Sequence, residues 1–383
     1  MADEQIGEHG RVDCSVLMPV LNEEAHIVAS VGAMRKQRFD GQLEFLVIDG
    51  GSRDRTREIL ARLAHEDPRI RVLENPRRIT SSGLNVGLRH ARGRWVARMD
   101  AHTQYPDDYL ALGVQRLAGA DTRWVSGPPI AVGRGRVSRA VALALRTPLG
   151  RGGSRKWAAA RDAAGQEYEL DSGVFAGVWE RETLLEYGGW DEQWLRNQDS
   201  EMAGRFLGRG ERLICIPAMA AEYVARDSLP SLGRQYLQYG EYREKTAVRH
   251  PHTMRRSHLL APGIVVTLAA AVGGFGLVRR AARAGVGVYL AALAGAGARA
   301  TRDTDRLEEA ALVPAVLAVM HVAYGVGSFR GAVRYGPPLA AIARVLGFAP
   351  APDRRAADAG GVDAPSLREG SIAPAPIPAS SPA

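Results

Sequence analysis

Two polar side chains that could share one cation follow an apolar run in the first third of the chain. The segment RMDAHTQYP places Asp100 and His102 two residues apart. If the strand continues, residues two apart point to the same side, so both side chains can reach one ion. A carboxylate oxygen and an imidazole nitrogen suit Mn²⁺ or Mg²⁺, which would act as a Lewis acid on a departing diphosphate. The alternative is an ordinary surface Asp and His.

A further carboxylate lies beside a predicted helix start. Residues 196–201, RNQDSE, precede an amphipathic helix and place Asp199 at or near its N-terminus. Asp199 could be a base that removes a proton from a hydroxyl group, or it could only cap the helix. Downstream, QYLQYGEYREK groups Gln235, Tyr239 and Arg243. The arginine could pair with phosphate charge, or it could belong to a solvated helix face.

Polar residues also follow the first two predicted strands, in PVLNEE and VIDGGSRDRT. Ligands of open α/β sheets bind at the carboxyl ends of parallel strands. Asp49, at such an end, could accept hydrogen bonds from a base or a ribose. The alternative is that Asp49 only starts the GGSRD turn.

Strands and helices alternate along the first half of the chain. Short apolar runs at 14–20, 43–49, 70–75 and 95–100 predict strands, and helical patterns lie between them. We expect Asn22 and Asp54 to be the N-caps of the first two helices. This alternation predicts βαβ units and an α/β fold with a mainly parallel central sheet. No G-x-G-x-x-G follows the first strand, which argues against a dinucleotide-dependent reductase.

The composition limits the class of protein. The chain has 383 residues and a net charge of +8, but its arginines are spread out and it carries no nucleic-acid-binding motif. We therefore expect no nucleic-acid partner. Cys14 and Cys215 each lie in an apolar run, so buried free thiols in a reducing compartment are expected. The polar N-terminus shows no secretory signal.

The second half is different, because residues 257–278, 284–298 and 310–329 contain no Asp, Glu, Lys or Arg. The first and third runs are about 20 residues long, enough to cross a bilayer as helices. The alternative is a buried helical hairpin of a soluble domain. The expected organisation is a disordered N-terminus (1–11), a catalytic domain (12–250), a membrane-associated helical region (251–335) and a disordered tail (349–383).

The order of PVLNEE, VIDGGSRDRT, RMDAHTQYP, GGWDEQWLRNQDSE and QYLQYGEYR resembles the family-2 glycosyltransferases, which have a GT-A fold. The uncharged C-terminal runs and HVAYGVGSFRG are similar to the succinoglycan-type exopolysaccharide glycosyltransferases. The resemblance covers about residues 12–335.

The resemblance implies a nucleotide-sugar site at the first strand ends. Pro19, Asn22, Glu23 and Asp49 match the residues that bind the nucleotide. Asp100 matches the first Asp of the metal-binding D-x-D motif.

It also implies a second metal ligand, a catalytic base and an acceptor side formed by Asp171, Ser172 and Gln198. His102 replaces the commoner second Asp of the metal motif. Asp199 matches the catalytic base of the E-D motif, in which Gln198 replaces the usual Glu. Asp171 and Ser172 resemble the segment that lines the acceptor.

The expected activity is therefore an inverting, metal-dependent transfer of one sugar from a nucleotide-diphosphate sugar, UDP-hexose or else GDP-mannose. The Q-x-x-R-W motif of processive synthases is absent, which favours single transfers. The expected acceptor is lipid-linked, and the expected location is the inner membrane with the catalytic domain in the cytosol. The alternatives are a polyprenyl-phosphate glycosyltransferase and a non-catalytic, sugar-nucleotide-binding scaffold.

Overall fold

The computed structural model describes residues 12–154, 156 and 165–348; the predicted disordered segments 1–11 and 349–383 lie outside them. The described residues form an eight-stranded sheet of order β3-β2-β1-β4-β9-β6-β10-β8. Its parallel part consists of β3 (Ile70–Glu74), β2 (Leu43–Asp49), β1 (Cys14–Val20) and β4 (Trp95–Arg98). The predicted parallel arrangement of the first half is confirmed.

The rest of the sheet is mixed. It contains β9 (Gly177–Glu180), β6 (Trp124–Ser126), β10 (Leu213–Cys215) and β8 (Tyr168–Glu169), with β9 antiparallel to both β4 and β6. A second, three-stranded sheet has the order β5-β11-β7, formed by β5 (Thr103–Gln104), β11 (Ala221–Val224) and β7 (Pro129–Val132).

Alternate residues of β1 point to opposite faces of the sheet, and helices cover both faces. Val16 and Met18 pack with α1 (Ile27–Arg35), α2 (Thr56–Glu66) and α4 (Tyr109–Leu117). Leu17 packs with α3 (Thr80–His90), α8 (Arg181–Glu186) and α9 (Gln198–Gly208) on the other face. Cys14 and Cys215 are buried free thiols in these two cores, as predicted.

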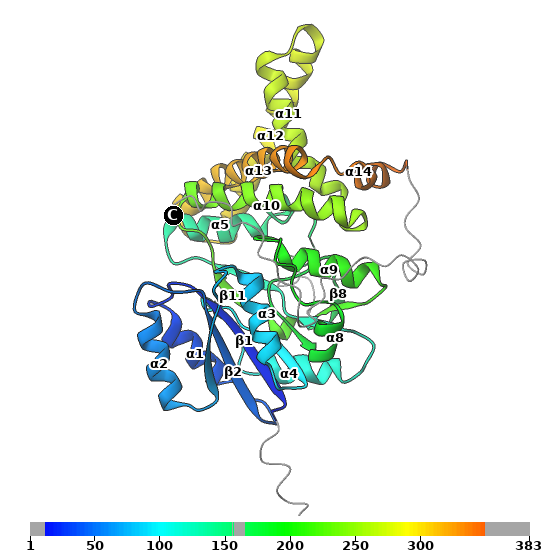
Figure 1. Cartoon of the computed structure of the whole chain (residues 1–383). Coiled ribbons are helices and arrows are strands. Elements are labelled where there is room, and N and C mark those ends of the chain that lie inside the picture. The colour runs from blue at the N-terminus through cyan, green and yellow to red at the C-terminus, as the bar shows by residue number, and fades with distance from the viewer. Residues whose placement is uncertain (1–11, 155, 157–164, 349–383) are drawn as a thin grey trace, which may run out of the picture.

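The remaining helices lie at one end of the sheet (Figure 1). They are α5 (Arg136–Arg146), α6 (Pro148–Arg151), α10 (Leu229–Arg249), α11 (Leu260–Gly273), α12 (Gly276–Ala300), α13 (Leu307–Tyr335) and α14 (Leu339–Leu346). Short 3₁₀ turns are η1 (Pro217–Met219), η2 (Pro251–Thr253) and η3 (Arg256–Leu259). Figure 1 shows α11 and α12 projecting as a hairpin, whereas α13 lies along α10.

The contact between α10 and α13 depends on glycines. A Cβ atom at Gly240 would overlap the carbonyl oxygen of Tyr324, and one at Gly327 would overlap that of Leu237. The buried Glu241 of α10 also pairs with Arg330 of α13 at 3.1 Å. The helix that contains the third apolar run, α13, is therefore packed closely against α10.

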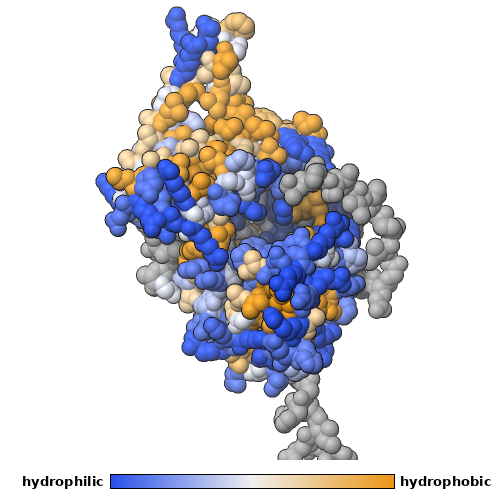
Figure 2. All heavy atoms as spheres, turned by 90° about the vertical axis from the view of Figure 1, so that its left-hand side faces the viewer, coloured by the Kyte–Doolittle hydropathy of each residue, from blue (hydrophilic) through white to orange (hydrophobic). Residues whose placement is uncertain are grey.

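The α11–α12 hairpin is much more exposed. Its turn carries Phe275 and Leu277, which are 87% and 81% exposed. Figure 2 shows apolar residues gathered over this projection, with hydrophilic residues at its outer end. Three segments, Arg256–Gly273, Gly276–Ala300 and Leu307–Tyr335, are long and apolar enough to cross a bilayer. These apolar helices indicate that the protein associates with a membrane.

Candidate functional site

The loops that follow β1 and β2 are joined by hydrogen bonds. The main-chain amide of Asn22 donates to Ser52 Oγ at 2.9 Å, and that of Glu23 donates to Thr56 Oγ1 at 2.8 Å. Asn22 Oδ1 accepts from the main-chain amide of Arg53 at 2.9 Å. The structure thus brings the predicted nucleotide-binding strand ends together.

The prediction that Asn22 caps the first helix is wrong. Asn22 has a positive φ of 54°, and α1 begins only at Ile27, with His26 before it. Asn22 Oδ1 is already bound to the neighbouring loop, so it is not free to accept from a helix amide. Asp54 partly meets its prediction, because Oδ1 accepts from the amide of Thr56, the first residue of α2, at 3.1 Å.

Asp49 is buried and organises the turn after β2. Its carboxylate accepts from the amides of Gly51 and Ser52, and from Ser52 Oγ at 2.6 Å. This is the turn-forming role that the sequence left open. Pro19 lies within β1 opposite Ile48 of β2.

A pocket of about 250 Å³ opens beside this turn. It is lined by Asp49, Arg57, Ala61, Val72 and Glu74, so it combines carboxylates, one cation and an apolar wall. Arg57 lies between the two carboxylates, 3.6 Å from Asp49 and 3.1 Å from Glu74. Sequence reasoning found Asp49 but missed the other lining residues, which come from α2 and β3.

Arg98 joins the predicted metal ligand to the predicted base. Its buried guanidinium donates to Asp100 at 2.7 and 3.0 Å, and to Asp199 Oδ1 at 2.8 Å. Asp100 lies two residues after β4, which ends at Arg98, and Asp199 lies in the first turn of α9. Sequence reasoning missed Arg98. A charged residue at the end of the apolar strand WVAR is a usable signal, because a buried charge needs a partner of opposite charge.

The environment of Asp199 changes its acidity. Burial raises the pKa of this carboxyl from 3.8 to about 6, with the positive charge of Arg98 opposing the rise and the negative charge of Asp100 adding to it. At neutral pH the group is therefore mostly ionised, yet it is a stronger proton acceptor than an ordinary Asp.

His102 lies near Asp100 and Glu23. Its side chain is 54% exposed, and Nδ1 is 3.3 Å from Glu23 Oε1. The hydrogen bond with Glu23 and the charge of Asp100 raise the pKa of His102, against the effect of burial. Among the described residues, no group of three or more His, Cys, Asp or Glu side chains could hold a metal ion.

The predicted acceptor segment lies against the main chain of Asp199. A Cβ atom at Gly173 would overlap the carbonyl oxygen of Asp199, so only glycine permits this approach. The preceding residues Asp171 and Ser172 accept from Arg255, at 3.1 and 3.3 Å. Gln198, also predicted for the acceptor side, is buried as the first residue of α9.

The predicted closing segment lies on α10. Gln235 Nε2 donates to the hydroxyl of Tyr239 at 3.0 Å, and the Tyr239 carbonyl accepts from Asn197 Nδ2 at 3.1 Å. The loop before Asp199 is thereby tied to α10. Arg243 is buried and donates to Thr253 Oγ1, so a solvated helix face is wrong for this residue.

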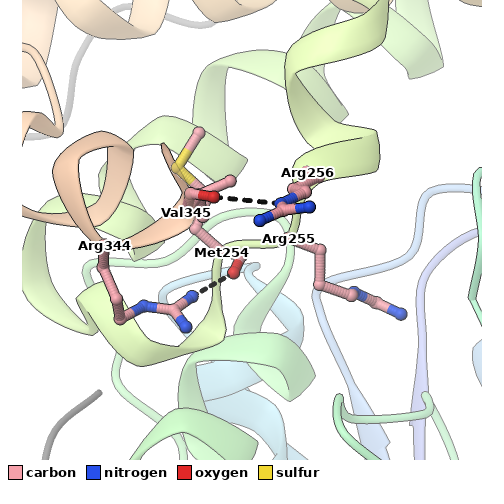
Figure 3. Close-up of a pocket in the computed structure, with 5 residues that line it drawn as sticks. All are labelled: Met254, Arg255, Arg256, Arg344 and Val345. Carbon is pink, nitrogen blue, oxygen red and sulfur yellow. Dashed lines mark hydrogen bonds between the residues drawn. The ribbon is translucent and has the colours of Figure 1, made fainter. Parts of the chain in front are cut away.

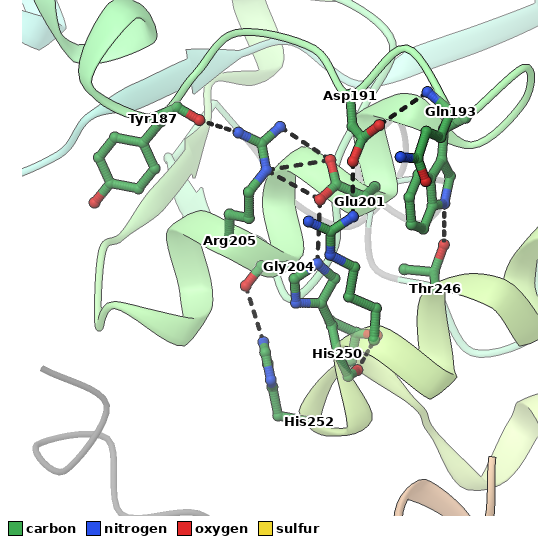
Figure 4. Close-up of polar contacts among 12 residues, drawn as sticks. Tyr187, Asp191, Gln193, Glu201, Gly204, Arg205, Thr246, His250 and His252 are labelled. Atoms are coloured by element: carbon green, nitrogen blue, oxygen red, sulfur yellow. Dashed lines mark hydrogen bonds and ion pairs between the residues drawn. The ribbon is translucent and has the colours of Figure 1, made fainter. Parts of the chain in front are cut away.

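A separate polar network fixes the other side of α9 (Figure 4). Buried Glu201 pairs with Arg205 at 2.9 Å and with His250 at 3.2 Å. Nearby, Asp191 pairs with Arg249 of α10 at 2.7 Å. Since Glu201 and Asp199 share one helical turn, these contacts hold Asp199 in place, and the sequence did not predict them.

Comparison with known proteins identifies the family. Residues 15–163 match the model of glycosyl transferase family 2. The chain is 33% identical over 326 residues to the succinoglycan biosynthesis protein ExoA of Rhizobium meliloti (strain 1021), a match that covers 82% of this chain and 93% of that protein. The chain belongs to glycosyltransferase family 2. The predicted resemblance to succinoglycan-type enzymes is confirmed.

Two further proteins resemble this family-2 glycosyltransferase. One, from Methanococcus voltae, is named dolichyl N-acetyl-alpha-D-glucosaminyl phosphate 3-beta-D-2,3-diacetamido-2,3-dideoxy-beta-D-glucuronosyltransferase and is 24% identical, covering 59% of this chain and 71% of that protein. The other is the mannosyltransferase PcManGT of Pyrobaculum calidifontis, solved with GDP-Man and Mn²⁺. It superposes with a TM-score of 0.55 at 23% identity, covering 82% of this chain and 86% of that one. This likeness confirms the GT-A fold.

Proposed function

We propose that this glycosyltransferase moves one sugar from a nucleotide-diphosphate sugar to a lipid-linked acceptor, in the synthesis of an exopolysaccharide or another cell-surface glycan. The link that Arg98 makes between Asp100 and Asp199 carries the proposal. This link supports a site in which Asp199 accepts a proton while Asp100, bound to the same arginine, holds a cation at the diphosphate.

The donor's nucleotide fits the pocket beside Asp49. Val72 offers an apolar wall to a base, while Asp49 and Glu74 can accept hydrogen bonds from a base or a ribose. UDP-hexose is the donor that we favour. GDP-mannose is the second candidate, because PcManGT was solved with GDP-Man.

Asp100 and His102 would hold a divalent cation, Mn²⁺ or Mg²⁺. One carboxylate and one imidazole make a sparse donor set, which fits an ion that takes its other ligands from phosphate and water. When bound, such an ion supplies stabilisation of negative charge on the departing diphosphate. Arg98 binds both oxygens of Asp100 and so fixes the orientation of this ligand.

Asp199 is the proposed base. It takes the proton of an acceptor hydroxyl, whose oxygen then attacks the anomeric carbon from the face opposite the diphosphate. One displacement of this kind inverts the anomeric centre. The close approach of Gly173 to the main chain of Asp199 supports an acceptor path that runs past Asp171 and Ser172 to this carboxylate.

The membrane-associated helices favour a lipid-linked acceptor, because a membrane-anchored enzyme meets such acceptors at a high effective concentration. The name of the relative from Methanococcus voltae also includes a dolichyl phosphate sugar. We place the protein at the inner membrane, with its catalytic domain in the cytosol.

Thermal unfolding of the detergent-solubilised protein tests this function. UDP and GDP are each added with and without Mn²⁺, to the native protein and to Asp100→Ala. A nucleotide at 100 times its dissociation constant should stabilise the fold by about 2.7 kcal/mol. We expect metal-dependent stabilisation by one nucleotide, lost in Asp100→Ala and retained in the surface control Glu58→Ala, whose side chain is 71% exposed.

Absence of stabilisation by either nucleotide in the native protein would contradict the proposal. NMR of the product then tests the stereochemistry. A retained anomeric configuration would contradict direct displacement by an acceptor oxygen.

A further inference from the structure

A second pocket, of about 320 Å³, lies between the segment that leads into α11 and helix α14. Arg255, Arg256 and Arg344 line it together with Met254 and Val345. Figure 3 shows Arg256 and Arg344 approaching from two sides, while Arg255 extends away from Arg344. The guanidinium groups of Arg256 and Arg344 beside one opening attract an anion.

In the described part of the chain, the hydrogen bonds of Arg256 and Arg344 go only to main-chain oxygens. Arg256 Nε donates to the carbonyl of Val345 at 3.1 Å, and Arg344 donates to the carbonyls of Pro251 and Met254. Within residues 12–154, 156 and 165–348, neither arginine forms an ion pair with a carboxylate. A guanidinium carries five N–H donors, so each keeps donors for a ligand.

Arg255 connects this pocket to the acceptor side of the catalytic site. Its terminal nitrogens donate to Asp171 and Ser172, and its buried Nε has no partner among the described residues. Arg243, whose charge interacts with that of Arg255, is 7% exposed and also has a buried Nε without a described partner. These unpaired donors are costly in a protein interior unless a ligand satisfies them.

Lys156 carries a further positive charge between Arg255 and Asp199. Burial and the charge of Arg255 lower the pKa of Lys156 to about 8, against the effect of Asp199. The Lys156 ammonium donates to the carbonyl of Gly173, which touches Asp199. The carboxylates that face this cationic path are Asp171, bound to Arg255, and Glu244, next to Arg243.

Exposed apolar residues at the start of α11 and along α14, here called the rim, lie on the two segments that line the pocket. Leu260 begins α11, and Leu339, Leu346 and Phe348 lie on or just after α14, with Phe348 83% exposed. Arginines at a pocket with exposed leucines and phenylalanine around it are typical of a surface that meets lipid headgroups. A free phosphate ion would make no use of this apolar rim.

We infer that the pocket lined by Arg255, Arg256 and Arg344 binds the phosphate or diphosphate of the lipid-linked acceptor, with the lipid chain over the rim of α14. This inference rests on the proposed function. The acceptor's sugar would then extend from the pocket along Arg255, past Asp171 and Ser172, to Asp199.

Binding to the full-length protein in detergent tests the inference. The probes are farnesyl diphosphate, inorganic pyrophosphate and phosphatidylglycerol. The variant Arg256→Ala/Arg344→Ala is compared with Arg299→Ala/Arg302→Ala, which removes the same charge at the exposed end of α12. We expect farnesyl diphosphate to bind the native protein and the control alike, more tightly than pyrophosphate, and the pocket variant at least about 30-fold more weakly.

Equal affinity of farnesyl diphosphate for all three proteins would overturn the inference. If pyrophosphate and farnesyl diphosphate bind with equal affinity, the pocket is a site for free phosphate, and the inference that it binds a lipid is overturned. Weakened phosphatidylglycerol binding with unchanged farnesyl diphosphate binding would make the pocket a bilayer contact, which also overturns it.

The donor experiment separates this inference from the proposed function. The pocket variant should keep metal-dependent stabilisation by nucleotide, which also shows that it is folded. Loss of farnesyl diphosphate binding together with intact donor stabilisation supports the inference. If the native protein shows no donor stabilisation, the proposed function fails, whatever the pocket binds.

Discussion

Arg98 donates a hydrogen bond to Asp199 at 2.8 Å, although 101 residues separate them in the chain. The same guanidinium binds Asp100, so one buried cation serves two carboxylates. Removal of one member of a buried ion pair leaves an uncompensated charge in the interior. Arg98 is therefore central to both the stability and the geometry of the site.

Arg98→Met should lower the free energy of unfolding by about 3 kcal/mol, because Asp100 and Asp199 lose their shared partner. Thermal unfolding in detergent measures the change. Arg62→Met is the control, since Arg62 is 64% exposed and its contact with Glu66 is 3.8 Å. Equal unfolding temperatures for the two variants would show that Arg98 contributes nothing.

Asp199→Asn should lower kcat by about 10²- to 10⁴-fold, because the acceptor hydroxyl loses its base. Nucleotide and Mn²⁺ should still stabilise this variant, since Asp199 does not hold the donor. Asp107→Asn, at an exposed position, serves as the control. Sugar transfer at the native rate by Asp199→Asn would exclude this residue as the base.

The rate should depend on pH through Asp199. Burial raises its pKa to about 6, and only the ionised carboxylate accepts a proton. We expect kcat/KM to be level above this pH and to fall about tenfold per pH unit below it. A profile of kcat/KM between pH 5 and 8 measures this, and an unchanged rate at pH 5 would contradict the assignment.

Gly173→Ala should lower kcat by about 100-fold, because its Cβ atom would displace the backbone at Asp199 and misplace the base. The matched control is Gly287→Ala in α12, where an added Cβ meets no atom within 4 Å. Assay of sugar transfer by both variants tests this contact. Similar kcat values for the two would show that the close approach is not needed.

Phe275→Asp/Leu277→Asp should release protein from membranes, since both residues are exposed at the hairpin turn. Fractionation of membranes after a salt wash measures the bound share. The control is Val28→Asp, a half-exposed position on α1. If the hairpin variant stays bound like the control, other surfaces anchor the protein.

Local patterns in the sequence predicted the parallel strands and the residues at their ends. Alternation of apolar residues and helix periodicity depend on neighbours in the chain, so β1 and β2 could be read directly. Asn22 shows the limit of such reading. Its side chain is a good helix cap by type, but the loop after β2 competes for it.

The C-terminal runs show the same limit. Their composition predicts three apolar helices but does not distinguish a helix packed on the rest of the protein from an exposed one. Packing does, because Gly240 and Gly327 let α10 and α13 approach closely, while the turn of α11 and α12 stays exposed.

The sequence alone thus determined the family resemblance and the parallel strands of the first half, and it led to the hypothesis that Asp100 and Asp199 are site residues. Only the tertiary structure decided that Arg98 joins these two carboxylates and that Arg255 links a second, basic pocket to the acceptor side. The reason is physical. Hydrogen bonds and charge pairs between distant segments depend on where the chain places them, and no local pattern encodes that distance.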